Sequence, residues 1–563
     1  MCPKTDFFED WLPGDRETCW ISDRALLLLA EIMIDRRTSR FFVTGIILVL
    51  SVSLGWWWGM SSKPATAVSR ADERAKVVER KSSIPSRDNS SVANSGSGFD
   101  ADARERGARE GQRTLRFSSA AELEAFLARA GDRVTVMSRL DALHALRIRF
   151  GKEEDLLSLL DGSEEMGFIY PVVAPDPRGG AVQEDAMALG NQLLRWLGLE
   201  KLDPKLGVGV KIAILDTGVV PHPAYGDVKN VFLVPASADF SQWNGHGTAV
   251  ASLILGNSTT VPGAAPGAEL TSWRIADDQG ISDSWLMAQA IVQAAESGHQ
   301  IISISMGSYG DSAVLRDAVT LAQSRGSVII ASSGNDGMSR AAYPAAYPQV
   351  VASVAVDAQN SHLLFSNQAP TSALATPGWG VSAAYPGDQV TMFSGTSASA
   401  PILAGSIAAV MSSKNLTASQ ALGQLYRYAN EAGSVGPDAF TGAGAVNVGR
   451  VLRSDVPNIV DAAVASMVIT PPRSGKSAQV QVNVQNQGTA AVGNLPLEVR
   501  TPGGTSSLMV PLMAPGEVKS FTIGLPNAAF ANGASVQVQG SIASEDAYFW
   551  NNQRASSLRA GER

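Results

Sequence analysis

Three short segments of the chain carry side chains used in acyl-transfer chemistry, and they occur in the order Asp, His, Ser. Asp216 follows an apolar run, His246 lies between two glycines, and Ser397 lies among small residues. A carboxylate, an imidazole and a hydroxyl are the groups of a nucleophilic triad. Each segment alone also has a structural explanation: a turn residue, a capping histidine or a plain Ser/Thr-rich helix cap.

Asp216 lies at the carboxyl end of a predicted buried strand, Val210–Leu215. Open α/β sheets place ligands and catalytic groups at that end of their strands. The triplet Asp216-Thr217-Gly218 also occurs in aspartic proteases, which need two such carboxylates facing each other. This chain has no second copy of the triplet, so that mechanism is disfavoured.

His246 and Ser397 each introduce a predicted helix of small residues. The glycines beside His246 allow another part of the chain to approach the imidazole closely. The positive end of a helix dipole disfavours imidazolium and keeps the histidine available as a base. The start of the helix at Ser397 has free backbone N–H groups, which are suited to binding an oxyanion.

Together the three segments resemble the subtilisin-like serine proteases, the subtilases. A fourth segment, Ala331–Gly337, resembles the family segment that carries the oxyanion-hole asparagine, here Asn335. The resemblance implies that Ser397 is the nucleophile, His246 the general base and Asp216 the residue that orients the histidine. The side chain of Asn335 and the backbone N–H of Ser397 are expected to bind the oxyanion.

The resemblance also implies substrate-binding residues on two segments. The segment 303–307 resembles the strand that pairs with an extended substrate, and 331–334 would complete the first specificity pocket. These walls are small and uncharged, which indicates an apolar or broad preference, but Asp336 at the rim could admit a basic residue. The implied substrate-binding residues are Ser303, Ser305, Met306, Gly307, Ala331, Ser332, Ser333, Gly334 and Asp336.

Two positions depart from the family pattern, and neither belongs to the triad. Ala249 stands where the family usually has a second histidine, and Ile402 stands where it usually has one after Pro401. No cofactor is expected; calcium is possible, but no cluster of oxygen ligands marks a site. The remaining histidines are expected to have structural, surface or packing roles, and they are His144, His222, His299 and His362.

Alternating strands and helices must position these residues. Near-continuous apolar strands with helices between them predict a doubly wound, mostly parallel α/β sheet. The subtilisin-like catalytic domain is expected over residues 184–455. The expected strands are Val210–Leu215, Leu270–Arg274, Ile301–Ser305, Val328–Ala331 and Val350–Val356, and the expected helices include Trp285–Ser297 and Ser312–Ser324.

An uncharged run over residues 41–60 is long enough to cross a bilayer as one helix. Arginines crowd its N-terminal side, which favours a cytoplasmic N-terminus and a cytoplasmic head over residues 1–40. The catalytic domain is then expected outside the inner cell membrane, in the periplasm or beyond. A cleaved signal peptide and a flipped topology are the alternatives.

Residues 61–112 are polar and charged and are expected to be a disordered linker. Residues 113–183 show the periodicity of a small α+β unit. It resembles the inhibitory propeptide that precedes subtilase domains, with the segment 168–173 as a closing strand and 170–175 in or near the active-site cleft. Cleavage between Val173 and Gly190 would release it. A permanent accessory domain is the alternative.

Residues 456–563 differ in character from the rest of the chain. Valines alternate with amides in Ser477–Gln485, and Pro-Gly and Gly-Gly turns follow, which predicts an antiparallel β-sandwich. Val484–Gly488 and Glu545–Asn552 resemble bacterial Ig-like adhesion modules of the cell-adhesion-related type. That likeness implies a protein or polysaccharide ligand, and a stabilising spacer is the alternative.

Composition narrows the function further. A net charge of −8 provides no basic excess for binding nucleic acid, and two cysteines, Cys2 and Cys19, exclude a disulfide scaffold. The sequence predicts a membrane-tethered serine endopeptidase that cuts proteins or peptides through an acyl-enzyme and processes itself. The alternative is a catalytically silent protein of the same fold that binds a ligand through its C-terminal sandwich.

Overall fold

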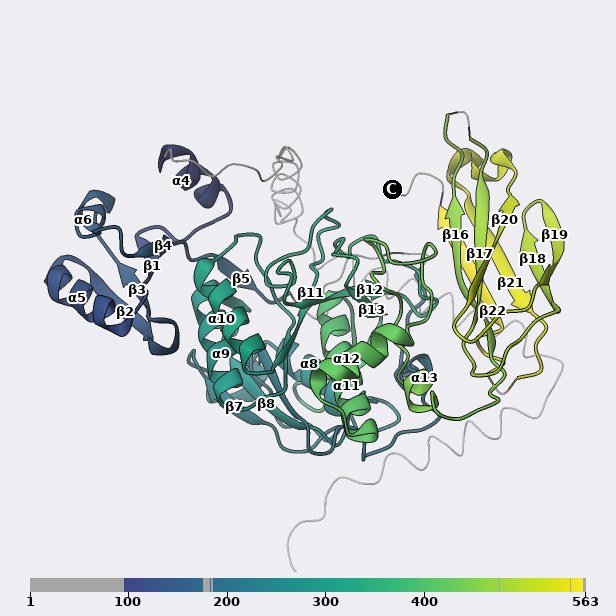
Figure 1. The fold of residues 1–563 in the computed structure, drawn as a ribbon, viewed down its shortest axis with the longest axis horizontal. Coiled ribbons are helices and arrows are strands. Elements are labelled where there is room, and N and C mark those ends of the chain that lie inside the picture. Colours follow the sequence, from purple (N-terminus) through teal and green to yellow (C-terminus); the bar gives the residue numbers. More distant parts are fainter. Residues whose placement is uncertain (1–95, 176–182, 184–185, 475, 547, 560–563) are drawn as a thin grey trace, which may run out of the picture. The chain divides into compact units, whose positions relative to one another are not determined.

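The computed structural model describes residues 96–175, 183, 186–474, 476–546 and 548–559. They form a small α+β unit, a parallel α/β domain and two antiparallel β-sheets (Figure 1). The predicted head, 1–40, and the predicted membrane span, 41–60, lie outside the described residues. Within the described residues, no helix combines the length and the apolar character needed to cross a membrane.

The α+β unit is an antiparallel four-stranded sheet, in the order β2-β3-β1-β4, with helices packed on it. Helix α5 begins where the Ser119 side chain accepts a hydrogen bond from the backbone N–H of Glu122, which makes Ser119 its N-cap. The elements are α4 (Gly96–Glu105), β1 (Gln112–Arg116), α5 (Ala120–Ala130), β2 (Thr135–Leu140), β3 (Ala145–Arg149), α6 (Glu153–Leu157) and β4 (Glu165–Gly167).

Two expectations for this region are wrong. Residues 96–112, expected to belong to a disordered linker, contain helix α4, because Ala103 packs against Phe168 and Tyr170 and gains tertiary burial. The segment 168–173 is not a closing strand of the unit, since the sheet ends with β4. Its last part, β5 (Pro171–Val173), pairs instead with a strand of the α/β domain.

A seven-stranded parallel sheet lies at the centre of the α/β domain, in the order β13-β12-β11-β10-β6-β8-β7. The predicted parallel sheet is confirmed. The strands are β6 (Lys211–Asp216), β7 (Lys229–Phe232), β8 (Glu269–Arg274), β10 (Ile301–Ile304), β11 (Val328–Ser332), β12 (Val351–Val356) and β13 (Leu374–Pro377). A short strand, β9 (Ile281–Asp283), and a hairpin, β14 (Val381–Tyr385) with β15 (Gln389–Phe393), lie outside it.

Helices cover both faces of this sheet. On β6, Ile212 and Ile214 belong to one core with residues of α8 and α11, whereas Ala213 and Leu215 belong to another with residues of α9 and α10. Strands buried on both faces read as continuous apolar runs, which is why the sequence predicted them. The helices are α7 (Leu193–Trp196), α8 (His246–Leu255), α9 (Ser284–Glu296), α10 (Ala313–Ser324), α11 (Thr396–Lys414), α12 (Ala418–Arg427) and α13 (Val448–Leu452).

The C-terminal region forms two antiparallel sheets, β16-β17-β20 and β19-β18-β21-β22, which share one apolar core. Val480, Val482 and Val484 are buried in that core, as their alternation predicted. The strands are β16 (Ala462–Thr470), β17 (Gln479–Asn486), β18 (Leu495–Thr501), β19 (Gly504–Val510), β20 (Val518–Gly524), β21 (Ser535–Ile542) and β22 (Gln553–Arg559).

Buried polar side chains join these sheets to the α/β domain. Arg450 of α13 donates to the carbonyl oxygens of Gln487 (3.1 Å) and Ala429 (2.9 Å). Arg554 of β22 donates to the carbonyl oxygen of Gln359. Burial lowers the pKa of both guanidinium groups to about 10, so both stay charged at neutral pH. Separating the two regions would deprive these charges of buried partners.

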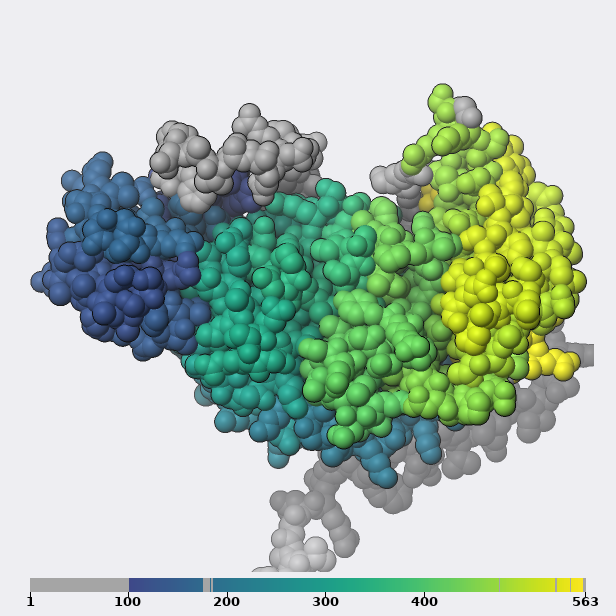
Figure 2. All heavy atoms as spheres, in the orientation of Figure 1, coloured from purple at the N-terminus to yellow at the C-terminus, as the bar shows by residue number. Residues whose placement is uncertain are grey.

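The α+β unit contacts α9 and α10, beside which it lies in Figure 2. Arg147 of β3 and Arg109 both pair with Asp283, at 2.8 and 3.2 Å. Asp283 is 2% exposed and also caps α9 by accepting from the backbone N–H of Leu286. The unit therefore neutralises a buried carboxylate of the domain that it covers.

Candidate active site

Asp216 and His246 are hydrogen-bonded at the carboxyl edge of the sheet. Asp216 ends β6, the strand at which the strand order changes direction, and His246 is the first residue of α8. Nδ1 of His246 is 2.8 Å from Oδ1 and 3.0 Å from Oδ2 of Asp216. Because a carboxylate only accepts, Nδ1 carries the proton and Nε2 is the basic nitrogen. Nε2 is buried and has no hydrogen-bond partner among the described residues.

Backbone contacts fix this pair. The N–H of Thr217 donates to Oδ1 of Asp216 (2.8 Å), and the N–H of Gly247 donates to Oγ1 of Thr217 (3.0 Å). A Cβ on Gly247 would lie 2.3 Å from the carbonyl oxygen of Gly218, so only glycine allows this approach. These contacts bring the start of α8 against the end of β6.

Ser397 is the second residue of α11 and is 1% exposed. Its Oγ donates to the carbonyl oxygen of Ser305 (2.9 Å), and Oγ of Ser305 donates to the carbonyl oxygen of Ser397 (3.0 Å). Ser305 follows Ile304, which pairs with Leu215, so Ser397 lies at the same sheet edge as Asp216. Proton transfer to His246 requires the hydroxyl to leave that carbonyl and turn toward Nε2.

Asn335 lies on the loop after β11, with its amide oriented by helix α11. Its Oδ1 accepts from the backbone N–H (2.8 Å) and from Oγ1 (2.9 Å) of Thr396. A Cβ on Gly395 would lie 2.9 Å from Nδ2 of Asn335. With Oδ1 occupied, Nδ2 is the donor left beside the start of α11, and the first N–H groups of that helix provide further donors.

The short strand β5 lies between β9 and Gly307, two residues after the Ser305 that bonds Ser397. β5 pairs antiparallel with β9, and Val173 also bridges Gly307 on the opposite side. The N–H of Ala174 donates to the carbonyl oxygen of Gly280 (2.8 Å). An extended chain held between two edges in this way has the geometry of a peptide bound by strand addition.

The register brings a proline to the position nearest the serine. Continuing the antiparallel bridge from Val173 and Gly307 by two residues places Pro175 opposite Ser305. Proline has no N–H, so it cannot donate to the carbonyl oxygen of Ser305. That oxygen accepts from Ser397 instead.

Comparison with known proteins agrees with this geometry. Residues 207–444 match the profile of the subtilase family. The chain is 37% identical to subtilisin BL of Lederbergia lenta over 252 residues, which are 44% of this chain and 92% of that protein. The chain belongs to the subtilase family. It is therefore a subtilisin-like serine endopeptidase, of a family that uses an Asp-His-Ser triad.

Two further proteins extend the comparison. The chain is 36% identical to the alkaline protease of Alkalihalobacillus alcalophilus over 336 residues, 56% of this chain and 87% of that protein. The crystal structure of the epidermin leader peptide processing serine protease of Staphylococcus aureus superposes with a TM-score of 0.51 at 19% identity. It covers 62% of this chain and 99% of that one. The second likeness concerns the fold alone.

The structure does not bring all predicted substrate-binding residues of this subtilase to the cleft. Ser303 lies within β10, between β6 and β11, so neither its backbone nor its buried side chain can pair with a substrate. Ala331 is likewise inside the sheet, on β11 between β10 and β12, whereas Ser332 ends β11 and pairs only with Ser353 of β12. The predicted residues that follow the strand ends are Ser305, Met306, Gly307, Ser333, Gly334 and Asp336.

Asp336 is already engaged by a tyrosine. Oδ2 of Asp336 accepts from the hydroxyl of Tyr309, and Arg340 lies over the Tyr309 ring at 5.5 Å. A carboxylate paired in this way is less able to attract a basic substrate side chain.

The other histidines make local contacts outside the triad. His222 accepts from the N–H of Ala224 and bonds to the carbonyl oxygen of Gln389, and His299 packs on Trp273. His144 ends a short turn in the left-handed region, with φ of 46°. His362 lines a cavity away from the triad and packs on Phe440.

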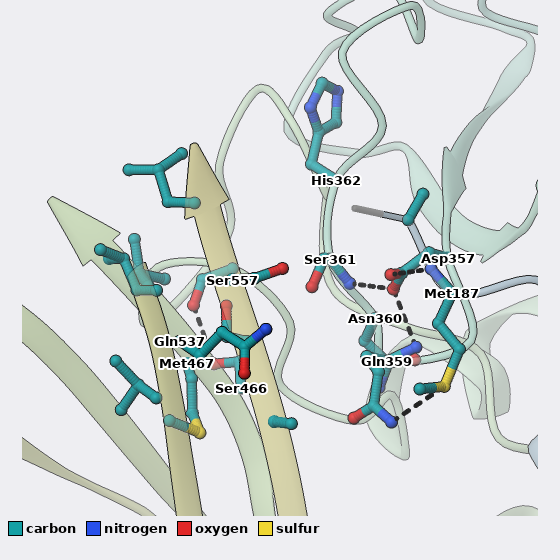
Figure 3. Close-up of a pocket in the computed structure, with 18 of the residues that line it drawn as sticks. Met187, Asp357, Gln359, Asn360, Ser361, His362, Ser466, Met467, Gln537 and Ser557 are labelled. Carbon is teal, nitrogen blue, oxygen red and sulfur yellow. Dashed lines mark hydrogen bonds between the residues drawn. The ribbon is translucent and has the colours of Figure 1, made fainter. Parts of the chain in front are cut away.

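That cavity has a volume of about 1010 Å³ and lies between the α/β domain and the C-terminal sheets (Figure 3). His362, Ser361 and Asp357 line one side, and Ser466 and Gln537 the other. None of the triad residues lines it. In the described part of the chain, no three His, Cys, Asp or Glu side chains gather as metal ligands, and no calcium site is identified.

Sequence reasoning missed three contributors to the site. β9 is only three residues long, Phe393 lies edge-on to His246 at 5.4 Å, and Thr217 links Asp216 to Gly247. Only Thr217 had a sequence signal, since it lies within the Asp-Thr-Gly triplet. The roles of the other two depend on tertiary contacts with distant segments.

Proposed function

We propose that this subtilase is a membrane-tethered, self-processing serine endopeptidase with its catalytic domain outside the inner cell membrane. The observation that carries the catalytic assignment is the buried Asp216–His246 pair. Its Nε2 has no partner in the part of the chain that the structure describes, and Ser397 and Asn335 lie at the same sheet edge. The substrates are proteins or peptides. No metal is needed for this chemistry.

The proposed reaction uses these groups in sequence. Oγ of Ser397 attacks the substrate carbonyl carbon while its proton passes to Nε2 of His246, and Asp216 stabilises the resulting imidazolium. Nδ2 of Asn335 and the N–H of Ser397 donate to the oxyanion. Collapse breaks the C–N bond, and the proton on Nε2 goes to the leaving amine. Water then hydrolyses the acyl-enzyme by the same proton transfers.

We assign residues 113–183 as a propeptide-like inhibitory unit and 184–455 as the catalytic domain. The pairing of β5 with β9 and Gly307 supports inhibition, because a bound substrate strand would need the same edges. Cleavage between Val173 and Gly190 would cut the covalent link, so the unit, with the membrane helix, would then be held by its contacts alone and could dissociate. The pairing of Arg147 in the unit, and of Arg109 just before it, with the buried Asp283 contributes to holding the unit in place.

The outer regions of the chain are assigned from sequence. Residues 41–60 supply the membrane helix, and 61–112 supply the flexible tether. The tether is shorter than the sequence predicts, because residues 96–105 form α4. Residues 456–563 are assigned as an Ig-like module for a protein or polysaccharide ligand. A reporter fused after Arg563 that is active only when exported would support this topology, and its inactivity would reverse it.

The deciding experiment compares the size and N-terminal sequence of the expressed chain with those of Ser397→Ala. We expect the wild type to be shortened between residues 173 and 190 and the variant to stay full length. Peptidase activity of the variant should fall by roughly 10⁶-fold.

If both chains are shortened alike, self-processing is wrong. If neither is shortened, a fluorophosphonate probe distinguishes the two remaining functions. Labelling of Ser397 would show an unprocessed enzyme, and absence of labelling would favour the silent binding protein.

A further inference from the structure

A second asparagine, Asn367, holds the loop that carries Asn335 through hydrogen bonds to its backbone. Asn367 is fully buried and lies on a different segment, between β12 and β13. Its Oδ1 accepts from the backbone N–H of Asp336 (3.1 Å) and from that of Met338 (2.9 Å). One side-chain oxygen thus fixes the loop on the C-terminal side of Asn335.

The same side chain fixes the loop on the other side. Nδ2 of Asn367 donates to the carbonyl oxygen of Ser333 (3.1 Å). The backbone N–H of Asn367 donates to the carbonyl oxygen of Gly334 (3.0 Å). A Cβ on Gly334 would lie 2.3 Å from Nδ2 of Asn367, so the amide is packed directly on the backbone. Gly334 has φ of 110°, a conformation that glycine adopts readily and other residues rarely do, so the backbone can turn here beside Asn367.

Tyr309 supports Asn367 in turn. Nδ2 of Asn367 also donates to the hydroxyl of Tyr309 (2.7 Å), and that hydroxyl donates to Asp336. Burial raises the pKa of Tyr309, so the hydroxyl remains a donor across the working pH range. The network joins three segments, and Asn335 is at its centre without being a member.

We propose that Asn367, supported by Tyr309, is the positioning residue for the oxyanion donor. The inference rests on the proposed function, in which Nδ2 of Asn335 binds the oxyanion. Oδ1 of Asn335 is tied to Thr396, so the direction of Nδ2 depends on where the loop holds the backbone of Asn335. A misplacement of about 1 Å at a reacting group can cost on the order of 10²-fold in rate.

The test is a double-mutant cycle on the full chain. kcat and KM for a small peptide substrate are measured for the wild type, Asn335→Ala, Asn367→Ala and the double variant, with active sites counted by a fluorophosphonate. We expect Asn335→Ala to lose roughly 10²–10³-fold in kcat. Asn367→Ala should lose about 10- to 100-fold in kcat, while its KM changes less than about threefold. In the double variant, kcat should fall less than about threefold below that of Asn335→Ala alone.

The outcomes separate the two proposals. Equal losses from Asn367→Ala in both backgrounds, or a loss confined to KM, would overturn the positioning role alone. An unchanged kcat in Asn335→Ala would overturn the oxyanion assignment, and the positioning role with it.

Two further variants test whether the loss of kcat in Asn367→Ala reflects only impaired folding. Tyr309→Phe keeps the ring and removes one hydrogen bond to Asn367, and it should show a smaller loss of kcat that also vanishes in Asn335→Ala. Asn486→Ala is the matched control, since Asn486 is fully buried and bonds backbone carbonyl oxygens in the C-terminal sheets. Asn486→Ala should lower stability and leave kcat unchanged. A loss of kcat as large as that of Asn367→Ala would overturn the inference.

Discussion

At the scale of single residues, Pro175 decides how the occupying strand meets the nucleophile. A residue with an N–H in this place is expected to donate to the carbonyl oxygen of Ser305 and to compete there with the hydroxyl of Ser397. The hydroxyl of Ser397 is bonded to that oxygen and, within the described residues, not to Nε2 of His246. The strand is bound as a substrate would be, but it lacks one of the hydrogen bonds that align a bond for attack.

We predict that Pro175→Ala speeds self-cleavage. One added hydrogen bond is worth about 1 kcal/mol, which corresponds to roughly fivefold in rate. The rate of appearance of the shortened chain and its N-terminal sequence measure the effect, and Pro171→Ala, at the other end of β5, is the matched control. An unchanged rate and cleavage position for Pro175→Ala would show that the bond is cut from another register.

Residue types also explain what the sequence could reveal of the site. Asp216, His246, Ser397 and Asn335 each have distinctive neighbours, so their segments were recognisable and the structure places all four at one sheet edge. Asn367 had no such signal. Its role depends on hydrogen bonds to a loop about thirty residues away in the chain, which only the fold brings close.

At the scale of elements, β9 and α9 connect substrate binding to the α+β unit. Asp283 is the last residue of β9 and the N-cap of α9, and two arginines of the unit neutralise it. Under the proposed function, the strand that would pair with a substrate therefore ends in a charge that the α+β unit covers. Loss of the unit exposes this carboxylate to water, where it no longer needs a partner.

We predict that Asp283→Asn weakens the hold of the α+β unit without harming α9, because asparagine is also a good N-cap. Removing one member of a buried ion pair costs about 2 kcal/mol or more, so inhibition by the unit should weaken by roughly 30-fold. The inhibition constant of the separately added unit for processed protease measures this. Glu296→Gln, which breaks an exposed pair with Arg325, is the control. Equal inhibition of all three proteases would contradict the prediction.

Elements differed in how well the sequence predicted them. β6, β10, β11 and β12 are buried on both faces, so their apolar runs were evident. β9 and the hairpin β14–β15 were missed because their residues carry no clear periodicity, and their pairing partners are set by the fold. Helix α4 was missed because its burial comes from the α+β unit and not from its own composition.

At the scale of the whole molecule, buried polar groups join the regions and give the fold a dependence on pH. Burial lowers the pKa of His362 to about 4, with Asp438 and a backbone bond at Ser366 opposing the shift. The unfolded chain then binds more protons than the folded one between about pH 4 and 6.5. Stability from this group is present above pH 6.5 and is lost as the pH falls toward 4. Asp461, whose pKa burial raises to about 6, has the opposite effect.

We predict that His362→Gln removes the contribution of this histidine. The difference in unfolding free energy between the variant and its parent should change by on the order of 2 kcal/mol from pH 7 to pH 4.5, with the parent losing more. Urea unfolding at both pH values measures this, with Ser397→Ala in both chains to prevent self-digestion. The effect of Asp461 is common to both chains and cancels. Parallel curves for the two chains would show that His362 is not the group responsible.

The strand β5 is part of the same polypeptide as the cleft that it fills, and this has a consequence for kinetics. A ligand joined through a short link is present at an effective concentration roughly in the millimolar range, whatever the amount of protein in solution. Substrates of the uncut chain compete against that constant local concentration, and dilution does not relieve it. Cutting the link turns the equilibrium from unimolecular to bimolecular. The cut protease then gains activity per molecule as it is diluted, so location and abundance themselves would regulate it.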